Sequence, residues 1–249
     1  MRSLLPRPAV VALAVAALIG TLAGCAVSVR PGTATVAAPP PILAPGPADR
    51  AAYTDLGPLQ EDADTAVSIV DRFWKAHWND SFTGTYTSPR VLGAYDPRAR
   101  CNPDDCGPLV PQNALYCPDG DFVGWDAGLI RKADRYGDSW IYLVIAHEWG
   151  HAVQERVEIG LRSQAAELQA DCLGAAALYG SATDGLLRFE ENDEKEIVQG
   201  LAEIGDQTPW TMAADHGDSF QRIAAFTAGR DGGVPACLPM AQASPQPGR

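Results

Sequence analysis

The spacing of apolar side chains predicts five helices along the chain. The five segments are residues 64–79, 138–157, 163–179, 184–204 and 219–228. In the first, apolar side chains recur three to four residues apart, at Val67, Val70, Phe73, Trp74 and Trp78. Polar residues that could cap helix starts and glycines that could end helices stand at the boundaries: Asp62 or Asp64, Asp138 or Ser139, Gly180, Gly205 and Gly229.

The segment between the first two helices has a different pattern. Residues 80–120 are rich in proline and predict loops, and Phe122 to Trp125 follows as a short strand. A set of helices with a small sheet predicts a helix-dominated α+β domain. We place this domain at residues 51–237 and expect residues 238–249, which contain three prolines, to form a disordered tail.

The N-terminal part of the chain carries export and anchoring signals. The apolar run Ala9 to Ile19 is too short to span a bilayer as a helix and is typical of a signal peptide. It ends in Leu22-Ala23-Gly24-Cys25, which resembles the lipobox of bacterial lipoproteins, where the cysteine is acylated. We therefore expect a lipoprotein signal peptide at 1–24, a lipid anchor on Cys25 and a proline- and alanine-rich tether at 25–50. The alternative is an ordinary signal peptide.

The charge balance excludes two classes of partner. Lys and Arg number 19 against 31 Asp and Glu, which gives a formal net charge of −12. Nucleic-acid binding needs a basic face, and electrostatic binding to anionic lipid needs basic clusters. We therefore expect no nucleic-acid partner, and contact with the membrane through the lipid anchor.

The motif His147-Glu148-Trp149-Gly150-His151 carries the chemistry. On a helix, His147 and His151 lie one turn apart on the same face, where two imidazoles can bind a single Zn²⁺. Glu148, next to the first ligand, can act as a base on a water molecule at the metal. The alternative is a pair of surface histidines on an amphipathic helix.

A catalytic zinc site needs a third protein ligand, and the next helix offers two carboxylates. Glu167 and Asp171 are also four residues apart and share one face. We assign Glu167 as the third ligand and Asp171 as the acceptor of a ligand histidine's free N–H, which would orient the imidazole. The loop near Gly160 is short enough to fold the two helices back antiparallel. The alternative is that both carboxylates are simply solvated.

The chain resembles the bacterial neutral zinc metallopeptidase family, a zincin-like group of exported or membrane-anchored proteins. The resemblance covers most of the domain and rests on these stretches: Phe73-Trp74, Tyr116-Cys117-Pro118, Ala146 to Gln154, Glu167 to Cys172 and His216 to Arg222. Trp149 and Ala152 depart from the family pattern. The resemblance implies a zincin-like fold and peptidase activity with Zn²⁺ as cofactor.

The resemblance also implies two roles near the metal. In zincins with a glutamate ligand, a His or Tyr on a later element often donates to the oxyanion, and His216 could take this place. The alternative is that His216 only caps or packs at the start of a helix. As in zincin edge strands, the strand at Phe122 to Trp125 would pair with an extended substrate. Arg222 is expected in an ion pair with Asp215 or Asp171.

Five cysteines remain besides the expected lipidation site. In an oxidising compartment they should mostly pair, and we favour Cys106–Cys117 and Cys172–Cys237, which leaves Cys101. A Cys101–Cys106 bridge is an open alternative.

These observations predict a lipid-anchored zinc metallopeptidase on the extracytoplasmic face of the bacterial cell membrane, with a peptide or protein as substrate. Two alternatives stay open. One is a non-catalytic, zinc-stabilised binding or scaffold protein of the cell envelope, against which Glu148 argues because a structural zinc needs no base. The other is a zinc-dependent amidase that acts on cell-wall peptide links.

Overall fold

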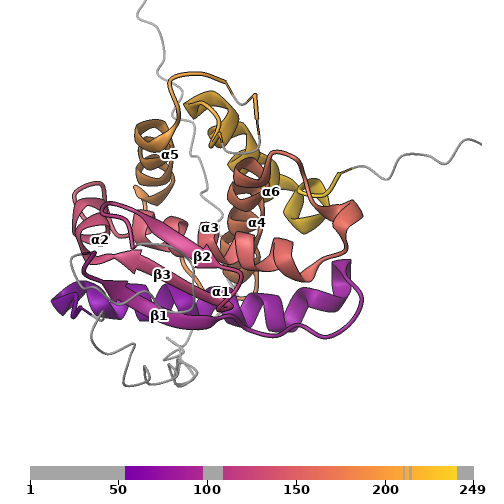
Figure 1. Ribbon diagram of the computed structural model, residues 1–249, viewed down its shortest axis with the longest axis horizontal. Helices are drawn as coiled ribbons and strands as arrows, with labels where there is room; N and C mark the ends of the chain where they lie inside the picture. Colours follow the sequence, from indigo (N-terminus) through magenta and orange to yellow (C-terminus); the bar gives the residue numbers. More distant parts are fainter. Residues whose placement is uncertain (1–53, 98–108, 210, 213–214, 240–249) are drawn as a thin grey trace, which may run out of the picture. The chain divides into compact units, whose positions relative to one another are not determined.

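The computed structural model describes residues 54–97, 109–209, 211–212 and 215–239 (Figure 1). The elements in chain order are η2 (Gly57–Leu59), α1 (Gln60–Ser81), β1 (Arg90–Tyr95), β2 (Ala114–Cys117), β3 (Phe122–Asp126), α2 (Ala127–Ala133), α3 (Ser139–Arg156), η4 (Ile159–Leu161), α4 (Ala166–Thr183), α5 (Asp193–Ile204) and α6 (Ser219–Ala236). Helices dominate and the sheet is small, which confirms the α+β class.

The three strands form one sheet in the order β1-β3-β2, in which β1 is parallel and β2 antiparallel to β3. The strand expected at Phe122 to Trp125 is therefore central and hydrogen-bonded on both sides. Its expected role as the edge strand that pairs with substrate is wrong, because both of its backbone edges are already paired, one with β1 and one with β2. In the described part of the chain β2 is an edge strand, and it comes from the segment expected to be loops.

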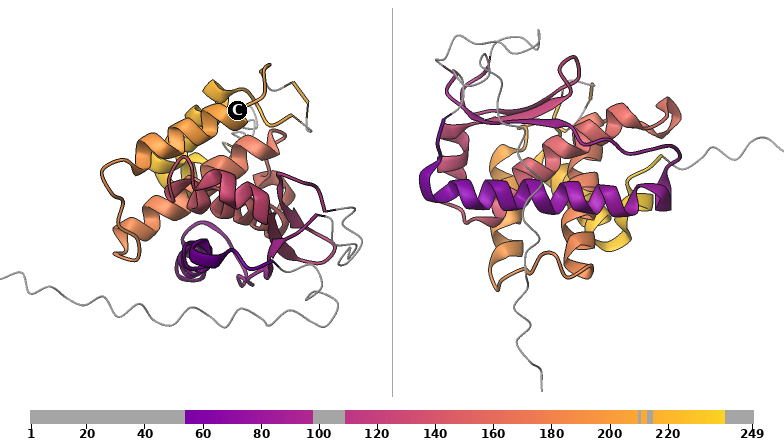
Figure 2. Two further views of the ribbon diagram at one scale, coloured as in Figure 1. Left: turned by 90° about the vertical axis from the view of Figure 1, so that its left-hand side faces the viewer. Right: turned by 90° about the horizontal axis from the view of Figure 1, so that it is seen from below.

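Helix α3 lies at the centre of the packing. It contacts α1, α2, α4, α5 and the strands β2 and β3, and most of its side chains are buried on every face. Figures 1 and 2 show α1 running across the domain, with α4 and α5 roughly perpendicular to it. Four tryptophans fill the core with almost no exposed surface: Trp74, Trp125, Trp140 and Trp149.

The helix starts differ from the expected capping. Helix α1 begins at Gln60 behind the 3₁₀ turn η2, so Asp62 and Asp64 lie inside it and no side chain caps its start. Asp138 does precede α3, but its side chain makes no capping hydrogen bond. The Ser139 hydroxyl, with one proton to donate, instead lies within hydrogen-bond distance of a backbone carbonyl and a carboxylate of α5. Helix α5 begins only at Asp193, because turns occupy the preceding residues.

Two glycines expected to end helices lie inside them instead. Helix α4 continues through Gly180, where the ring of Phe73 occupies the space that a side chain would need. Helix α6 continues through Gly229, which lies against the backbone carbonyl of Cys172. Both glycines therefore serve close packing rather than helix termination, whereas Gly205 ends α5 as expected.

The disulfide Cys172–Cys237 is confirmed and ties α4 to the end of α6. Cys117 is also in a disulfide. The residue expected to pair with it, Cys106, lies outside the described residues, as does Cys101. The signal peptide, Cys25, the tether and nearly all of the expected tail also lie outside them. Within the described ranges, no helix combines the length and apolar character needed to cross a bilayer.

Helices α3 and α4 cross at backbone contact. A Cβ atom on Gly150 would lie 2.7 Å from the carbonyl oxygen of Ala170, and one on Gly174 would lie 3.0 Å from the carbonyl carbon of Ala146. Because both neighbours are backbone atoms, a side chain at either glycine would push the helices apart.

Gly150→Ala is therefore expected to lower the free energy of unfolding by about 1–3 kcal/mol, although alanine is the better helix former. Urea denaturation measures this. Gly160→Ala is the matched control, because a Cβ atom there meets nothing within 4 Å. Equal stability of the two variants would contradict the tight crossing.

Candidate metal centre

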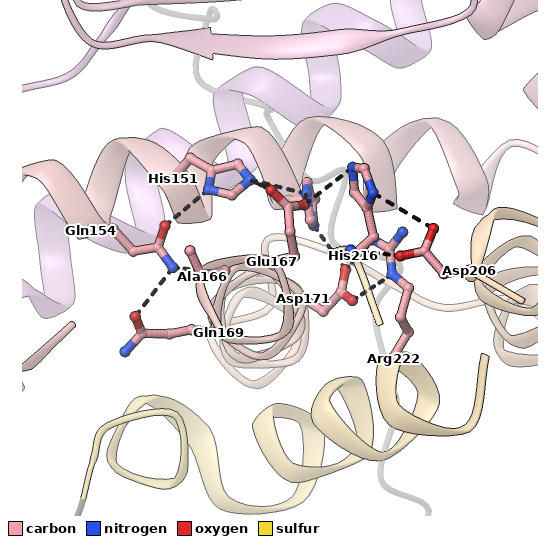
Figure 3. Close-up of polar contacts among 10 residues, drawn as sticks. His151, Gln154, Ala166, Glu167, Gln169, Asp171, Asp206, His216 and Arg222 are labelled. Atoms are coloured by element: carbon pink, nitrogen blue, oxygen red, sulfur yellow. Dashed lines mark hydrogen bonds and ion pairs between the residues drawn. The ribbon is translucent and has the colours of Figure 1, made fainter. Parts of the chain in front are cut away.

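Three side chains from α3 and α4 converge on one point, as the sequence predicted. The Nε2 atoms of His147 and His151 are 3.2 Å apart, and the carboxylate of Glu167 lies 3.2 Å from the first and 3.4 Å from the second (Figure 3). Three ligand atoms that bind one tetrahedral Zn²⁺ at about 2.0–2.1 Å are separated by roughly 3.3 Å. The spacing of the three ligand atoms therefore fits a zinc ion.

A buried carboxylate orients His147, as expected for Asp171. Nδ1 of His147 lies 2.8 Å from Oδ1 of Asp171, which can only accept, so Nδ1 carries the proton. Arg222 of α6 donates two hydrogen bonds of 2.7 Å to the same carboxylate. The expected ion pair of Arg222 is therefore with Asp171, and Asp215 instead accepts from Thr211. Since the neutral imidazole has one N–H, Nε2 of His147 faces the site with its lone pair.

An amide orients His151. Its Nδ1 lies 2.9 Å from Oε1 of Gln154, an acceptor, so the lone pair of its Nε2 also faces the site. Two imidazole lone pairs and a carboxylate at mutual distances near 3.3 Å repel one another unless a cation or a proton lies between them. The chemistry of this donor set therefore suits a borderline metal ion such as zinc.

The electrostatics of the centre favour positive charge. Burial by itself would lower the pKa of His147, but the carboxylates of Asp171 and Glu167 outweigh it and raise this pKa to about 10. Burial would raise the pKa of Glu167, but hydrogen bonds with the two histidines hold it far below its usual range. Without a metal, a proton shared with the imidazoles satisfies these carboxylates. A metal ion would replace that proton.

Glu148 lies beside the three ligand atoms but is not one of them. Glu148 is 7% exposed, and the backbone N–H of Tyr116 in β2 donates to its carboxylate. Burial raises its pKa, and the charges of the two neighbouring histidines only partly offset this effect. Glu148 therefore lines the cavity next to the metal ligands without belonging to the ligand set.

The structure brings His216 close to the same centre. Its Nε2 lies 3.8 Å from Oε2 of Glu167, and its backbone N–H donates to Asp206 (Figure 3). The side chain is 54% exposed and lines the cavity, so it can reach a bound molecule. Its expected role at an oxyanion stays a prediction.

A cavity of about 580 Å³ opens over the three ligands. Ala114, Leu115 and Tyr116 of β2 are among the residues that line it. Trp149, the residue of the motif that departs from the family pattern, does not line this cavity. Its indole N–H donates to the hydroxyl of Tyr86 in the core, on another face of α3.

The sequence reasoning missed two polar residues beside the ligands, Gln154 and Gln169. Gln154 follows His151 by three residues and so shares its face of α3, which is a signal that could have found it. Gln169 stands between Glu167 and Asp171 in the sequence, and only the packing of α4 reveals its contact with Gln154.

Comparison of the chain with protein-family models, with curated proteins and with solved structures found no match. The assignment of this centre therefore rests on the geometry and chemistry of its own residues.

This centre is expected to bind one zinc ion, because the ligand atoms of His147, His151 and Glu167 converge at one point and include the two imidazoles that zinc prefers. His147→Ala and His151→Ala should each abolish tight binding, measured by elemental analysis after dialysis. His77→Ala is the matched control, since the side chain of His77 bonds to Asp80 and Asp184 and does not line the cavity. Stoichiometric zinc in the double variant His147→Ala/His151→Ala would refute the assignment.

Proposed function

We propose that the chain is a zincin-like zinc metallopeptidase that hydrolyses peptide bonds. The observation that carries the proposal is the combination of three converging ligand atoms with a fourth group, Glu148, that is held beside them without being a ligand. Two histidines one turn apart on a buried helix, followed by a glutamate from the next antiparallel helix, support the zincin-like relationship.

The ligand count favours an enzyme over a zinc-stabilised scaffold. Structural zinc sites are closed by four protein ligands, whereas catalytic sites leave one position for water or substrate. The described residues supply three ligand atoms here, and the three residues line the cavity. A scaffold would also have no use for the buried carboxylate of Glu148.

In this mechanism the bound zinc ion would act as a Lewis acid that polarises the scissile carbonyl and lowers the pKa of a water molecule. His147, His151 and Glu167 would hold the ion, and Asp171 would keep His147 in the correct tautomer. Glu148 would take a proton from the attacking water and return it to the leaving amine. His216, exposed in the cavity, would donate a hydrogen bond to the oxygen on which negative charge develops.

The edge strand β2 offers a place for the substrate backbone. Among the described residues it pairs only with β3, and Ala114, Leu115 and Tyr116 line the cavity. An extended peptide could add to this strand through main-chain hydrogen bonds and so lie across the metal centre. The substrate strand would therefore pair with β2 and not with the central strand β3.

Glu148→Gln is expected to stop hydrolysis while leaving zinc content and thermal stability near the wild-type values, because the amide keeps the size of the side chain but cannot accept the proton. General-base catalysis contributes roughly 10²–10⁴-fold in rate. Cleavage of a peptide library, zinc content and melting temperature are measured together.

Glu158→Gln is the control for the loss of a nearby charge, since Glu158 lies beyond the end of α3 and outside the cavity. If Glu148→Gln cleaves as fast as the wild type, Glu148 is not the base. A zinc-loaded wild type that cleaves nothing in a broad library would favour the scaffold function.

The proposal includes lipid anchoring at the extracytoplasmic face of the cell membrane, supported by the sequence Leu22-Ala23-Gly24-Cys25. Cys25→Ser is expected to abolish acylation and lipoprotein-type processing. Mass spectrometry of the mature N-terminus measures this. An unmodified Cys25 in the wild type, or cleavage at a different site, would contradict it.

A further inference from the structure

The two ligand histidines are oriented by chemically different partners. His147 donates to a carboxylate, which can only accept. His151 donates to an amide, and an amide has an accepting and a donating end. If Gln154 were turned over, its NH₂ group would face Nδ1 of His151, and the proton of the imidazole would move to Nε2, where it would block a metal ion. The orientation of Gln154 therefore matters for the site.

Two acceptors fix the orientation of Gln154. Its Nε2 lies 2.7 Å from the carbonyl oxygen of Ala166 and 3.1 Å from Oε1 of Gln169. A backbone carbonyl cannot donate, so the NH₂ group of Gln154 must point toward Ala166, and Oε1 is left for His151. Gln154 is 6% exposed, so water competes little for these groups.

Backbone groups on three sides fix Gln169 in turn. Its NH₂ group donates to the carbonyl oxygens of Leu161 and Cys237, at 2.8 and 3.0 Å, and its Oε1 accepts from the backbone N–H of Ser163 at 2.9 Å. A backbone carbonyl can only accept a hydrogen bond and a backbone N–H can only donate one. All three bonds therefore form in just one orientation of the Gln169 amide. It is 4% exposed.

These hydrogen bonds form a network in which each group fixes the orientation of the next. Backbone groups at the end of α6 and before α4 fix Gln169, Gln169 fixes Gln154, and Gln154 fixes the tautomer of His151. We propose that Gln154 and Gln169 are positioning residues that hold His151 with its proton on Nδ1 and its Nε2 available to the metal. The inference rests on the proposed function, since it requires that His151 bind a metal ion.

The test uses Gln169→Leu in the full chain, because Gln169 touches neither His151 nor the cavity. Zn²⁺ affinity is measured by competition with a chelator, and the geometry of the ligands is followed by the absorption spectrum of the Co²⁺-loaded protein. We expect Zn²⁺ affinity to fall about 10–100-fold, as is typical when a partner behind a metal ligand is lost, and the Co²⁺ bands to change.

Ser181→Ala is the matched control. Ser181 is a fully buried polar residue of the same helix whose hydroxyl donates to Ile69, far from the histidines in the sequence and outside the cavity. This variant is expected to lower the melting temperature without changing Zn²⁺ affinity or the Co²⁺ spectrum. If Gln169→Leu also lowers the melting temperature but leaves Zn²⁺ affinity and the Co²⁺ spectrum unchanged, its effect is a loss of packing alone, and the inference is overturned.

A double-mutant cycle tests the network itself. Gln154→Leu and Gln169→Leu interrupt the same hydrogen-bond network. The double variant should therefore bind Zn²⁺ with about the affinity of whichever single variant binds it less tightly. Additive losses would overturn the inference. If Gln169→Leu does not fold, Gln154→Leu decides by the same affinity and spectrum. A wild type that binds no metal would refute the proposed function together with this inference, whereas normal binding by a folded Gln variant would refute the inference alone.

Discussion

The candidate metal centre depends on the backbone contact between α3 and α4. A Cβ atom at Gly150 or Gly174 would lie only 2.7–3.0 Å from the backbone of the other helix and would force the two helices apart. The helices run antiparallel, so a residue one turn later in α3 lies opposite a residue one turn earlier in α4. His147 therefore faces Asp171, and His151 comes within 3.4 Å of Glu167. The two histidines of α3 and the two carboxylates of α4 can form one centre only because the helix backbones are in contact.

Sequence periodicity predicted the helices of the centre because they are long and buried, and it predicted the ligands because their chemistry needs spacings of four. It missed β1 and β2, since short strands next to prolines show little alternation. It also misplaced helix ends at Gly180 and Gly229. A glycine that ends a helix and a glycine that admits a neighbouring backbone look the same in sequence, and only the tertiary contact distinguishes them.

Helix α6 also contributes to the centre, although it is far from α3 and α4 in the sequence. Local sequence patterns therefore could not predict these contacts. Arg222 comes from its first turn and holds Asp171, and the carbonyl of Cys237 lies just beyond its last turn and holds Gln169. The disulfide joins Cys237 to Cys172, the neighbour of Asp171. A buried pair of charges such as Asp171 and Arg222 adds little to stability. The ion pair keeps Asp171 ionised, so that its carboxylate accepts the hydrogen bond that Nδ1–H of His147 donates.

The count of charges explains why one histidine has a carboxylate behind it and the other an amide. Arg222 interacts electrostatically with Asp171, Glu167 and Glu148. When these three carboxylates are ionised and the imidazoles are neutral, the four groups carry a net charge of −2. A divalent cation supplies the two missing positive charges. A fourth carboxylate in place of Gln154 would leave the loaded centre negative and raise the desolvation cost of every buried charge in it. A neutral amide fixes the tautomer of His151 without this cost, but only because other groups fix the amide.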